Sequence, residues 1–168
     1  CPLDPLAYKQ FLELERSHWW MRGRRRVYLG LIEHFLRAQK PRRILDLGAG
    51  IGGFLEGLDR IHPEGGRVYP ADIDAESLGH ISKRGFPGGV IADGYALPYR
   101  SGSFDLICLF DAIEHTGDDL AVMVEIERVL APGGHVFVSV PAYQFLFANN
   151  DRVAQHYRRY RRSRLNDL

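Results

Sequence analysis

The sequence predicts an α/β protein with a doubly wound, mainly parallel sheet. Short apolar runs alternate along the chain with stretches of helical periodicity, which is typical of parallel strands joined by right-handed helical crossovers. The first apolar run is followed by the glycine-rich segment DLGAGIGG at 46–53, as expected where a strand turns tightly into a helix. In such folds ligands bind beyond the carboxyl ends of the strands.

Each element is predicted from its apolar pattern and from the glycines and prolines that bound it. Four apolar residues, Leu29, Ile32, Phe35 and Leu36, are spaced to share one face of a helix, which Pro41 ends. The predicted strands are 42–48, 66–73, 88–94, 104–113 and 135–141. The predicted helices are 5–14, 27–38, 50–61, 76–85 and 119–134.

The chain divides into three predicted parts. Residues 1–40 form an N-terminal helical lid, 41–141 the strand-rich core, and 142–168 a basic and aromatic segment that ends in a helix-like stretch. No sixth strand is recognisable after residue 141, and the last stretch stops abruptly at Leu168. We therefore expect the chain to be a piece of something longer.

Composition and charge narrow the class of protein. A chain of 168 residues with 45% apolar and 26% charged residues suits one globular domain. The net charge of +1 is uneven: residues 1–43 carry +6, residues 44–150 carry −9 and residues 151–168 carry +4. The basic ends either close over an anionic ligand or balance the acidic middle.

Cysteine usage and hydropathy indicate a cytoplasmic location. Cys1 and Cys108 are the two cysteines, and Cys108 lies in an apolar run where it reads as a small core residue. No apolar run approaches the ~20 residues of a membrane span.

The glycine segment fits two patterns. Gly48, Gly50 and Gly53 match the dinucleotide pattern G-x-G-x-x-G, whereas Gly48, Gly50 and Gly52, preceded by Asp46, match D-x-G-x-G-x-G. Asp46 favours the second pattern, because a carboxylate at the mouth of the loop repels a pyrophosphate. The same carboxylate attracts the ammonium group of S-adenosylmethionine (SAM).

Two further aspartates end predicted strands. Asp72 can accept hydrogen bonds from both hydroxyls of a ribose, and Asp93 can accept one from the amino group of an adenine, beside the apolar side chains of Ile73 and Leu97. The alternative is that these aspartates cap helices and turns, as aspartate often does at such positions.

Together these motifs closely resemble the class I SAM-dependent methyltransferases. The resemblance covers residues 42–141, includes LPYRSGSFDLI and VLAPGG, and is strongest to the type 11, quinone-biosynthesis-like small-molecule group. It implies a Rossmann-like sheet with strand order 3-2-1-4-5, with the final strands of the family missing. It also implies that SAM is the cofactor and S-adenosylhomocysteine the product. The cofactor-binding residues so implied are Asp46, Gly48, Ala49, Gly50, Gly52, Asp72, Ile73, Asp93, Gly94, Phe110 and Asp111.

The segment after the fourth strand supplies the candidates for catalysis. SAM already carries the reactive methyl group, so a protein base is needed only when the acceptor must lose a proton. His115 is the leading candidate, since its ordinary pKa lies near neutrality, and Glu114 lies beside it on the substrate side. The alternative is that His115 only caps a turn and packs.

A second set of candidates lies in QHYRRYRR at 155–162. The resembling family often has an H-x-R-R-Y segment after strand five, which makes His156 a second catalytic candidate and places Arg159 and Tyr160 at the substrate pocket. Arginine there can bind a carboxylate or phosphate. The alternative is a solvated basic helix with an aromatic face. We expect no metal ligand in the chain.

The stretch ERSHWWMRGRRR begins the basic N-terminal part. Resembling enzymes carry an E-x-x-H-W-W segment, which Glu15, Trp19 and Trp20 match, and as a lid the tryptophans would wall the substrate pocket. Arg22, Arg24, Arg25 and Arg26 would then face the acidic core or an anionic acceptor. Alternatively, the tryptophans dock a helix on the core and the arginines are solvated.

The sequence therefore predicts methyl transfer from SAM to O, N or C of a small molecule. Three alternatives stay open: an RNA methyltransferase, favoured by the basic ends; a non-catalytic SAM-binding module; and an NAD-dependent oxidoreductase, disfavoured by Asp46. We expect a small-molecule acceptor, no nucleic acid and no membrane span, with a homodimer as a further option.

Overall fold

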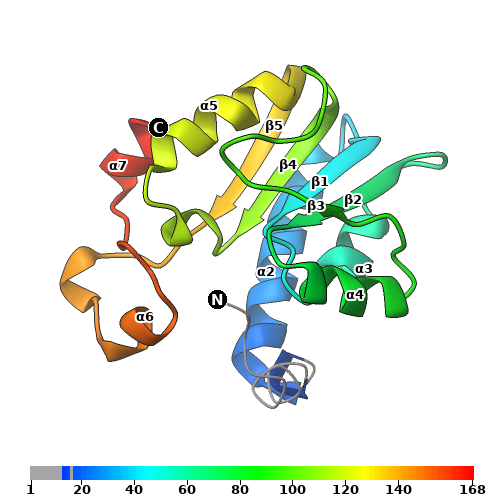
Figure 1. Ribbon diagram of the computed structural model, residues 1–168. Helices are drawn as coiled ribbons and strands as arrows, with labels where there is room; N and C mark the ends of the chain where they lie inside the picture. Colours follow the sequence, from blue (N-terminus) through cyan, green and yellow to red (C-terminus); the bar gives the residue numbers. More distant parts are fainter. Residues whose placement is uncertain (1–12, 16) are drawn as a thin grey trace.

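The computed structural model describes residues 13–15 and 17–168 and contains a five-stranded sheet with the order β3-β2-β1-β4-β5 (Figure 1). All neighbouring strands pair in parallel. The predicted doubly wound class and strand order are confirmed. The strands are β1 Arg43–Leu47, β2 Arg67–Asp72, β3 Val90–Ile91, β4 Phe104–Phe110 and β5 Leu130–Ser139. The helices are α2 Trp19–Leu36, α3 Leu55–Asp59, α4 Ala75–Lys83, α5 Asp119–Val129, α6 Asn149–Val153 and α7 Arg162–Asn166, with short 3-10 turns at Ile113–His115 and Gln144–Leu146.

The register places the carboxyl ends of the central strands side by side. Asp46 on β1 lies opposite Pro70 on β2 and Cys108 on β4. On the outer side, Phe110 of β4 lies opposite Ser139 of β5. The residues that follow β1, β2 and β4 therefore meet at one edge of the sheet, where a doubly wound fold binds its ligand.

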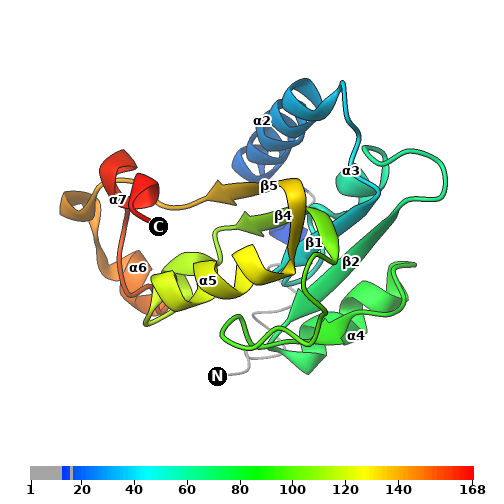
Figure 2. The same cartoon turned by 90° about the horizontal axis from the view of Figure 1, so that it is seen from above.

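Two apolar layers cover the sheet. One cluster joins Leu55 of α3 and Ile81 of α4 with Ile32 and Leu36 of α2, and the other joins Ile126 and its neighbours on α5 with the opposite faces of the strands. Figure 2 shows α2 and α5 on opposite sides of β4 and β5. Strand alternation sends neighbouring side chains into different clusters. Helix α2 is thus a core-covering helix over its second half, not only a lid.

Several predicted boundaries differ from the structure; for example, the helix predicted over 50–61 is Leu55–Asp59, and the strand predicted over 104–113 ends at Phe110. The helix expected over 119–134 ends at Val129, and Leu130 is already extended, because Pro132 cannot sit inside a helix. The residues before His135 form an irregular start of β5. The third strand is shorter than expected and follows Gly88, whose φ is +90°. Helix α2 begins at Trp19, capped by the His18 side chain, well before residue 27.

The helix-like basic stretch expected at the end of segment 142–168 is helical only in part. The segment holds the short helices α6 and α7, with extended chain between them that pairs Ala142 with Tyr160. Within the described residues it adds no further strand to the sheet. The predicted helix 5–14 lies almost wholly outside the described residues. Among those that are described, no helix has the length and apolarity to cross a membrane.

Candidate functional site

The backbone of the glycine loop decides between the two patterns that the sequence allows. Gly48, Gly50 and Gly52 have φ values of +75°, +52° and +79°, in the left-handed region that favours glycine. Gly53 is not in this region. The loop therefore uses the D-x-G-x-G-x-G spacing that begins at Asp46, and Gly53 is a glycine for another reason.

That reason is Glu15. A Cβ atom added to Gly53 would collide with the Glu15 carboxylate, which is buried against the loop. Arg25 and Arg84 approach the same carboxylate at 3.3 and 3.4 Å, and Arg84 also donates to the carbonyl oxygen of Ile51 at 2.7 Å. The segment before α2 thus lies directly on the glycine loop.

Asp46, near the end of β1, has a buried carboxyl group, one oxygen of which lacks a hydrogen-bond donor in the described part of the chain. Its side chain is 2% exposed, and its Oδ1 atom has no hydrogen-bond partner among the described residues. Burial, together with the nearby charge of Asp72, raises the pKa of Asp46 to about 7. Leaving such a group unpartnered is costly, and an ammonium group in the loop would supply the missing donor.

Asp72 connects the end of β2 to the glycine loop. Its Oδ2 accepts the backbone N–H of Gly50 at 2.7 Å, and its Oδ1 accepts the N–H of Asp74 at 2.9 Å. Each carboxylate oxygen has a further lone pair. Asp72 can therefore hold the loop and still accept from the two hydroxyls of a ribose.

The predicted adenine-binding residues lie on the surface beyond β3. Asp93 is exposed, and its Oδ1 accepts the N–H of Tyr95 at 3.0 Å, while Gly94 faces Val122. Ile73 is 71% exposed. Contrary to the prediction, Leu97 is 4% exposed and belongs to the core, so it offers no apolar face to a ligand.

The ring of Phe110 also lies in the core, not at the predicted cofactor site. It stacks on Phe54 with ring centroids 3.6 Å apart and contacts Tyr28 and Phe137. Alternation along β4 explains this, because Leu109 points into the cluster under α5 and Phe110 into the cluster under α2. Spacing alone did not reveal which face carries a ligand.

Asp111 follows as a strained and firmly held residue. Its φ is +52°, which is uncommon for a residue with a side chain. Its N–H donates to the carbonyl of Ser139 at 3.0 Å, the Ser139 hydroxyl donates to its Oδ1 at 3.0 Å, and Arg24 forms an ion pair with its Oδ2. Neither Ser139 nor the pairing with Arg24 was predicted from the sequence.

The two tryptophans do not dock α2 on the core. Trp19 is 75% exposed and Trp20 54% exposed, whereas the helix is held by apolar side chains in its second half and by Arg24 and Arg25 on carboxylates. The alternative of docked tryptophans is therefore wrong. Of the arginines, Arg24 and Arg25 are paired, whereas Arg22 and Arg26 are exposed. The lid role of Trp19 and Trp20 stays a prediction.

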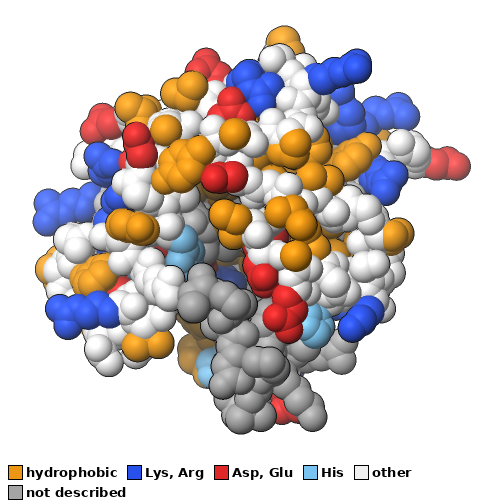
Figure 3. All heavy atoms as spheres, viewed as in Figure 1, with side chains coloured by type: hydrophobic (Ala, Val, Ile, Leu, Met, Phe, Trp, Pro, Cys, Tyr) orange, Lys and Arg blue, Asp and Glu red, His pale blue; other side chains and the backbone are white. Residues whose placement is uncertain are grey.

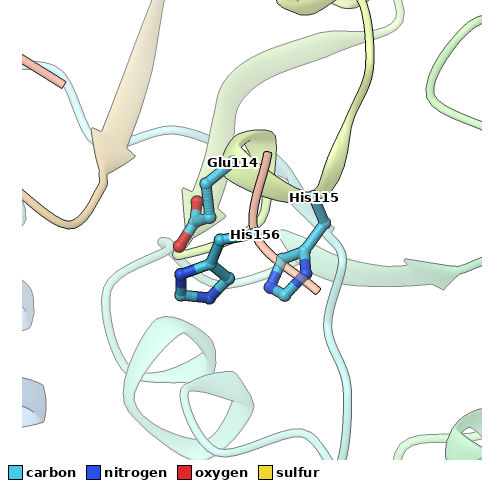
Figure 4. A group of neighbouring side chains, drawn as sticks. All are labelled: Glu114, His115 and His156. Carbon is cyan, nitrogen blue, oxygen red and sulfur yellow. The ribbon is translucent and has the colours of Figure 1, made fainter. Parts of the chain in front are cut away.

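Glu114, His115 and His156 gather in one group beyond β4 (Figure 4). One ligand atom from each residue lies within 4.8 Å of the others. The rings of His115 and His156 have centroids 4.7 Å apart and are nearly perpendicular. The N–H of Tyr157 donates to the Glu114 carbonyl at 2.8 Å, which holds the tail against this turn. Two segments distant in the sequence thus place the predicted catalytic histidines side by side.

The protonation states of Glu114 and His115 are set mainly by burial. Burial raises the pKa of Glu114 to about 8. Burial, and then the charge of His156, lower the pKa of His115. Near neutral pH the Glu114 carboxyl is therefore mostly protonated and the His115 imidazole mostly neutral.

Asp151 contacts the group of Glu114, His115 and His156, and the sequence did not predict this contact. It is 2% exposed and accepts hydrogen bonds from Nε and Nη2 of Arg159, both at 2.8 Å, and from the N–H of Ala148 at 2.8 Å. Its Oδ1 lies 3.0 Å from Nδ1 of His156. The hydrogen bonds from Arg159 lower the pKa of Asp151. Contrary to the prediction, the Arg159 guanidinium is committed to Asp151 and not free for a substrate anion.

Tyr160 likewise anchors the tail and does not face a substrate. It is 2% exposed, and its hydroxyl donates to Oδ2 of Asp119 at 3.1 Å. Arg164 donates to the other oxygen of Asp119 at 2.6 Å. Although burial alone would raise the pKa of Asp119, these partners hold it below its usual value. The alternative of a solvated basic helix also fails, since the chain around Tyr160 is extended.

Comparison with known proteins identifies the family. A family model described as a methyltransferase domain matches residues 45–138, which include the glycine loop and four of the five strands in full or nearly so. The chain belongs to this family. The predicted class, a type 11 SAM-dependent methyltransferase, is confirmed at the level of the family.

Curated relatives of this methyltransferase domain include methyltransferases from bacteria and plants. The chain is 32% identical over 130 residues to a probable SAM-dependent methyltransferase of Mycolicibacterium smegmatis, covering 76% of this chain and 48% of that protein. It is 31% identical over 117 residues to norajmaline N-methyltransferase of Rauvolfia serpentina, covering 65% and 39%. The chain thus spans less than half the length of these relatives.

Solved structures share the fold of this methyltransferase domain. The YcgJ protein of Bacillus subtilis superposes with a TM-score of 0.70 at 23% identity, covering 84% of this chain and 65% of that one. A phosphoethanolamine N-methyltransferase of Haemonchus contortus superposes with a TM-score of 0.69 at 22% identity, covering 84% and 35%. That structure is a complex with phosphomonomethylethanolamine and S-adenosylhomocysteine.

Proposed function

We propose that this chain binds SAM and transfers its methyl group to O, N or C of a small-molecule acceptor. The observation that carries the proposal is Asp46, a buried carboxyl group with an unpartnered oxygen at the start of a loop of left-handed glycines. A dinucleotide would bring a pyrophosphate to this carboxyl group, whereas SAM brings an ammonium group.

The residues at the edge of the sheet fit the cofactor. Asp46 would hold the ammonium group, Gly50 has open space where a side chain would project, and Asp72 keeps acceptor capacity for a ribose. Asp93 and Ile73 are both exposed at the next strand and are available to an adenine. When bound, SAM supplies an electrophilic methyl group that needs only an aligned nucleophile.

The acceptor would bind on the side of β4, where Asp111, Glu114, His115 and His156 lie. His115 is exposed and mostly neutral near pH 7, so it can take a proton from an acceptor hydroxyl or ammonium group. The exposed Trp19 and Trp20 belong to the helix whose Arg24 pairs with Asp111. They would exclude water when an acceptor is present.

A small molecule is favoured over RNA because many arginines of the basic ends already have carboxylate partners. Arg24, Arg25, Arg159 and Arg164 each pair with an aspartate or glutamate. On the part of the face in Figure 3 that described residues form, Lys and Arg side chains lie scattered around the rim and make no continuous patch. A phosphate backbone is normally bound by a continuous basic surface.

Calorimetric titration of the purified chain with SAM, S-adenosylhomocysteine and NAD tests the proposal. We expect the first two to bind and NAD not to bind. Asp72→Asn should lower SAM affinity about 10-fold or more, since a hydrogen bond to a charged group is worth about 1.5–3 kcal/mol. Asp59→Asn is the matched control, because Asp59 is over half exposed at the end of α3. Binding of NAD without SAM, or equal SAM affinity of the two variants, would contradict the assignment.

A further inference from the structure

The methyl-transfer proposal leaves the carboxyl group of Glu114 without a role. Glu114 is 0% exposed, and neither Oε1 nor Oε2 has a hydrogen-bond partner among the described residues. Buried polar groups are nearly always hydrogen-bonded, because an unsatisfied one costs free energy. A carboxyl group with both oxygens free in the interior therefore indicates a partner that the described side chains do not provide.

Two imidazoles face this carboxyl group. Figure 4 shows Glu114 and His115 descending from one turn and His156 between them, with the polar ends gathered on one side. Their ligand atoms lie within 4.8 Å of one another. The ligand atoms around a tetrahedral ion with bonds of about 2.1 Å lie roughly 3.4 Å from one another. Modest rotation of the three side chains would therefore bring their ligand atoms close enough to bind one ion.

His156 is already oriented as a metal-binding histidine is. Its Nδ1 lies 3.0 Å from Oδ1 of Asp151, which leaves Nε2 for a ligand bond. Asp151 is itself fixed by both donors of Arg159 and by the N–H of Ala148. A carboxylate behind the imidazole fixes its tautomer and raises its basicity as a ligand.

We propose that Glu114, His115 and His156 bind a divalent transition-metal ion of the zinc class. Two imidazoles and one carboxylate suit Zn²⁺, Co²⁺ or Fe²⁺, and three protein ligands leave at least one coordination position open. His115 is exposed, so an ion can reach the site from solvent. This departs from the sequence analysis, which predicted no metal ligand.

The consequence for the reaction rests on the proposed function. An acceptor hydroxyl or carboxylate can occupy the open position beside Asp111, and a bound hydroxyl loses its proton more readily because the ion stabilises the anion. His115 then acts as a ligand and not as the base. The acceptor class that this site selects is an oxygen compound able to coordinate a metal.

Titration of the purified, metal-free chain with Co²⁺, without SAM or acceptor, tests the site. We expect one ion per chain and the visible absorption of four- or five-coordinate Co²⁺, displaced by Zn²⁺. Glu114→Gln and His156→Ala should each lower the affinity about 100-fold or more, and Asp151→Asn about 10- to 100-fold. Glu127→Gln and His34→Ala, both exposed on helices away from the site, are the controls and should bind as the parent chain does.

Circular dichroism confirms that each variant is folded before it is titrated. Equal affinity of Glu114→Gln and Glu127→Gln, or no Co²⁺ binding by the folded parent chain, would overturn the metal site. Retained SAM binding in that case would leave the proposed function standing. Loss of SAM binding with retained Co²⁺ binding would contradict the proposed function and not the metal site.

Discussion

At the scale of single residues, Asp46 shows how a group proposed to bind the cofactor lowers the stability of the fold that carries it. Its carboxyl group is buried, and its pKa is raised to about 7. The folded chain therefore holds a proton on Asp46 over a pH range where the unfolded chain has already released it. The stability that Asp46 contributes while protonated is lost as the pH rises from its ordinary pKa of about 4 to its folded pKa.

Asp46→Asn should remove this loss. Near pH 5 the variant should be more stable than the parent by about 1–2 kcal/mol, and near pH 8 by about 4 kcal/mol, because the unfolded chain releases the Asp46 proton from about pH 4 upward. Urea denaturation at both pH values measures the difference, and the variant should bind SAM more weakly at either pH. Equal destabilisation of the variant at both pH values would show that Asp46 has a structural hydrogen-bonding role instead.

Single residues also show which parts of the site could be predicted from the sequence and which could not. The glycines and Asp46 could be predicted because backbone conformation and strand ends depend on local sequence. Phe110, Arg159 and Tyr160 were misplaced because burial and ion pairing are decided by tertiary packing. Asp151 was missed because a lone acidic residue in a basic tail has no spacing that indicates its partner.

At the scale of elements, the positions of the helices and strands along the chain were predicted better than their lengths. Every predicted strand exists, and the helices after β1, β2 and β4 are where the apolar pattern placed them. The boundary between α5 and β5 was wrong because Pro132 breaks the helix before the apolar pattern fades. The course of 142–168 was not predictable, since ion pairs on Asp119 and Asp151 fix it.

The contact between Gly53 and Glu15 makes a prediction about how the N-terminal segment is attached. Gly53→Ala adds a Cβ that collides with the Glu15 carboxylate, and overpacking of this kind costs about 1–3 kcal/mol. In a Glu15→Ala background the cost of Gly53→Ala should vanish, because Gly53 does not need a left-handed backbone. A double-mutant cycle of urea denaturation measures the coupling. An unchanged cost in both backgrounds would place the strain in the loop itself.

At the scale of the whole molecule, the start of the described chain and the part of the tail around α6 converge on the same edge of the sheet, whereas α7 lies beside α5 (Figure 1). Figure 1 shows α6 and the start of α2 on the side toward which β4 and β5 point. The start of α2 is fixed there by Arg24 on Asp111, and the tail by the hydrogen bond from Tyr157 to Glu114. The acidic middle and the basic ends that composition revealed thus meet around the proposed site.

The fold, and with it the meeting of the strand ends at one edge, could be predicted at this scale because a doubly wound sheet places its strand ends together whatever the details of packing. The group of Glu114, His115 and His156 could not be predicted as a cluster. Its third member comes from a segment whose path depends on buried ion pairs. The sequence suggested the histidines one at a time, and the structure brings them to within 4.8 Å of each other and of Glu114.

A crystal structure of the chain with S-adenosylhomocysteine tests the central claim most directly. We predict that the amino group of the ligand lies within about 3 Å of a carboxyl oxygen of Asp46. Its ribose hydroxyls should donate hydrogen bonds to Asp72, and its adenine should lie beside Asp93 and Ile73. The account would be contradicted by a ligand bound elsewhere, for example in the groove of about 520 Å³ along β5 that Tyr143 and Arg161 line. It would equally be contradicted if a saturating concentration left the glycine loop empty.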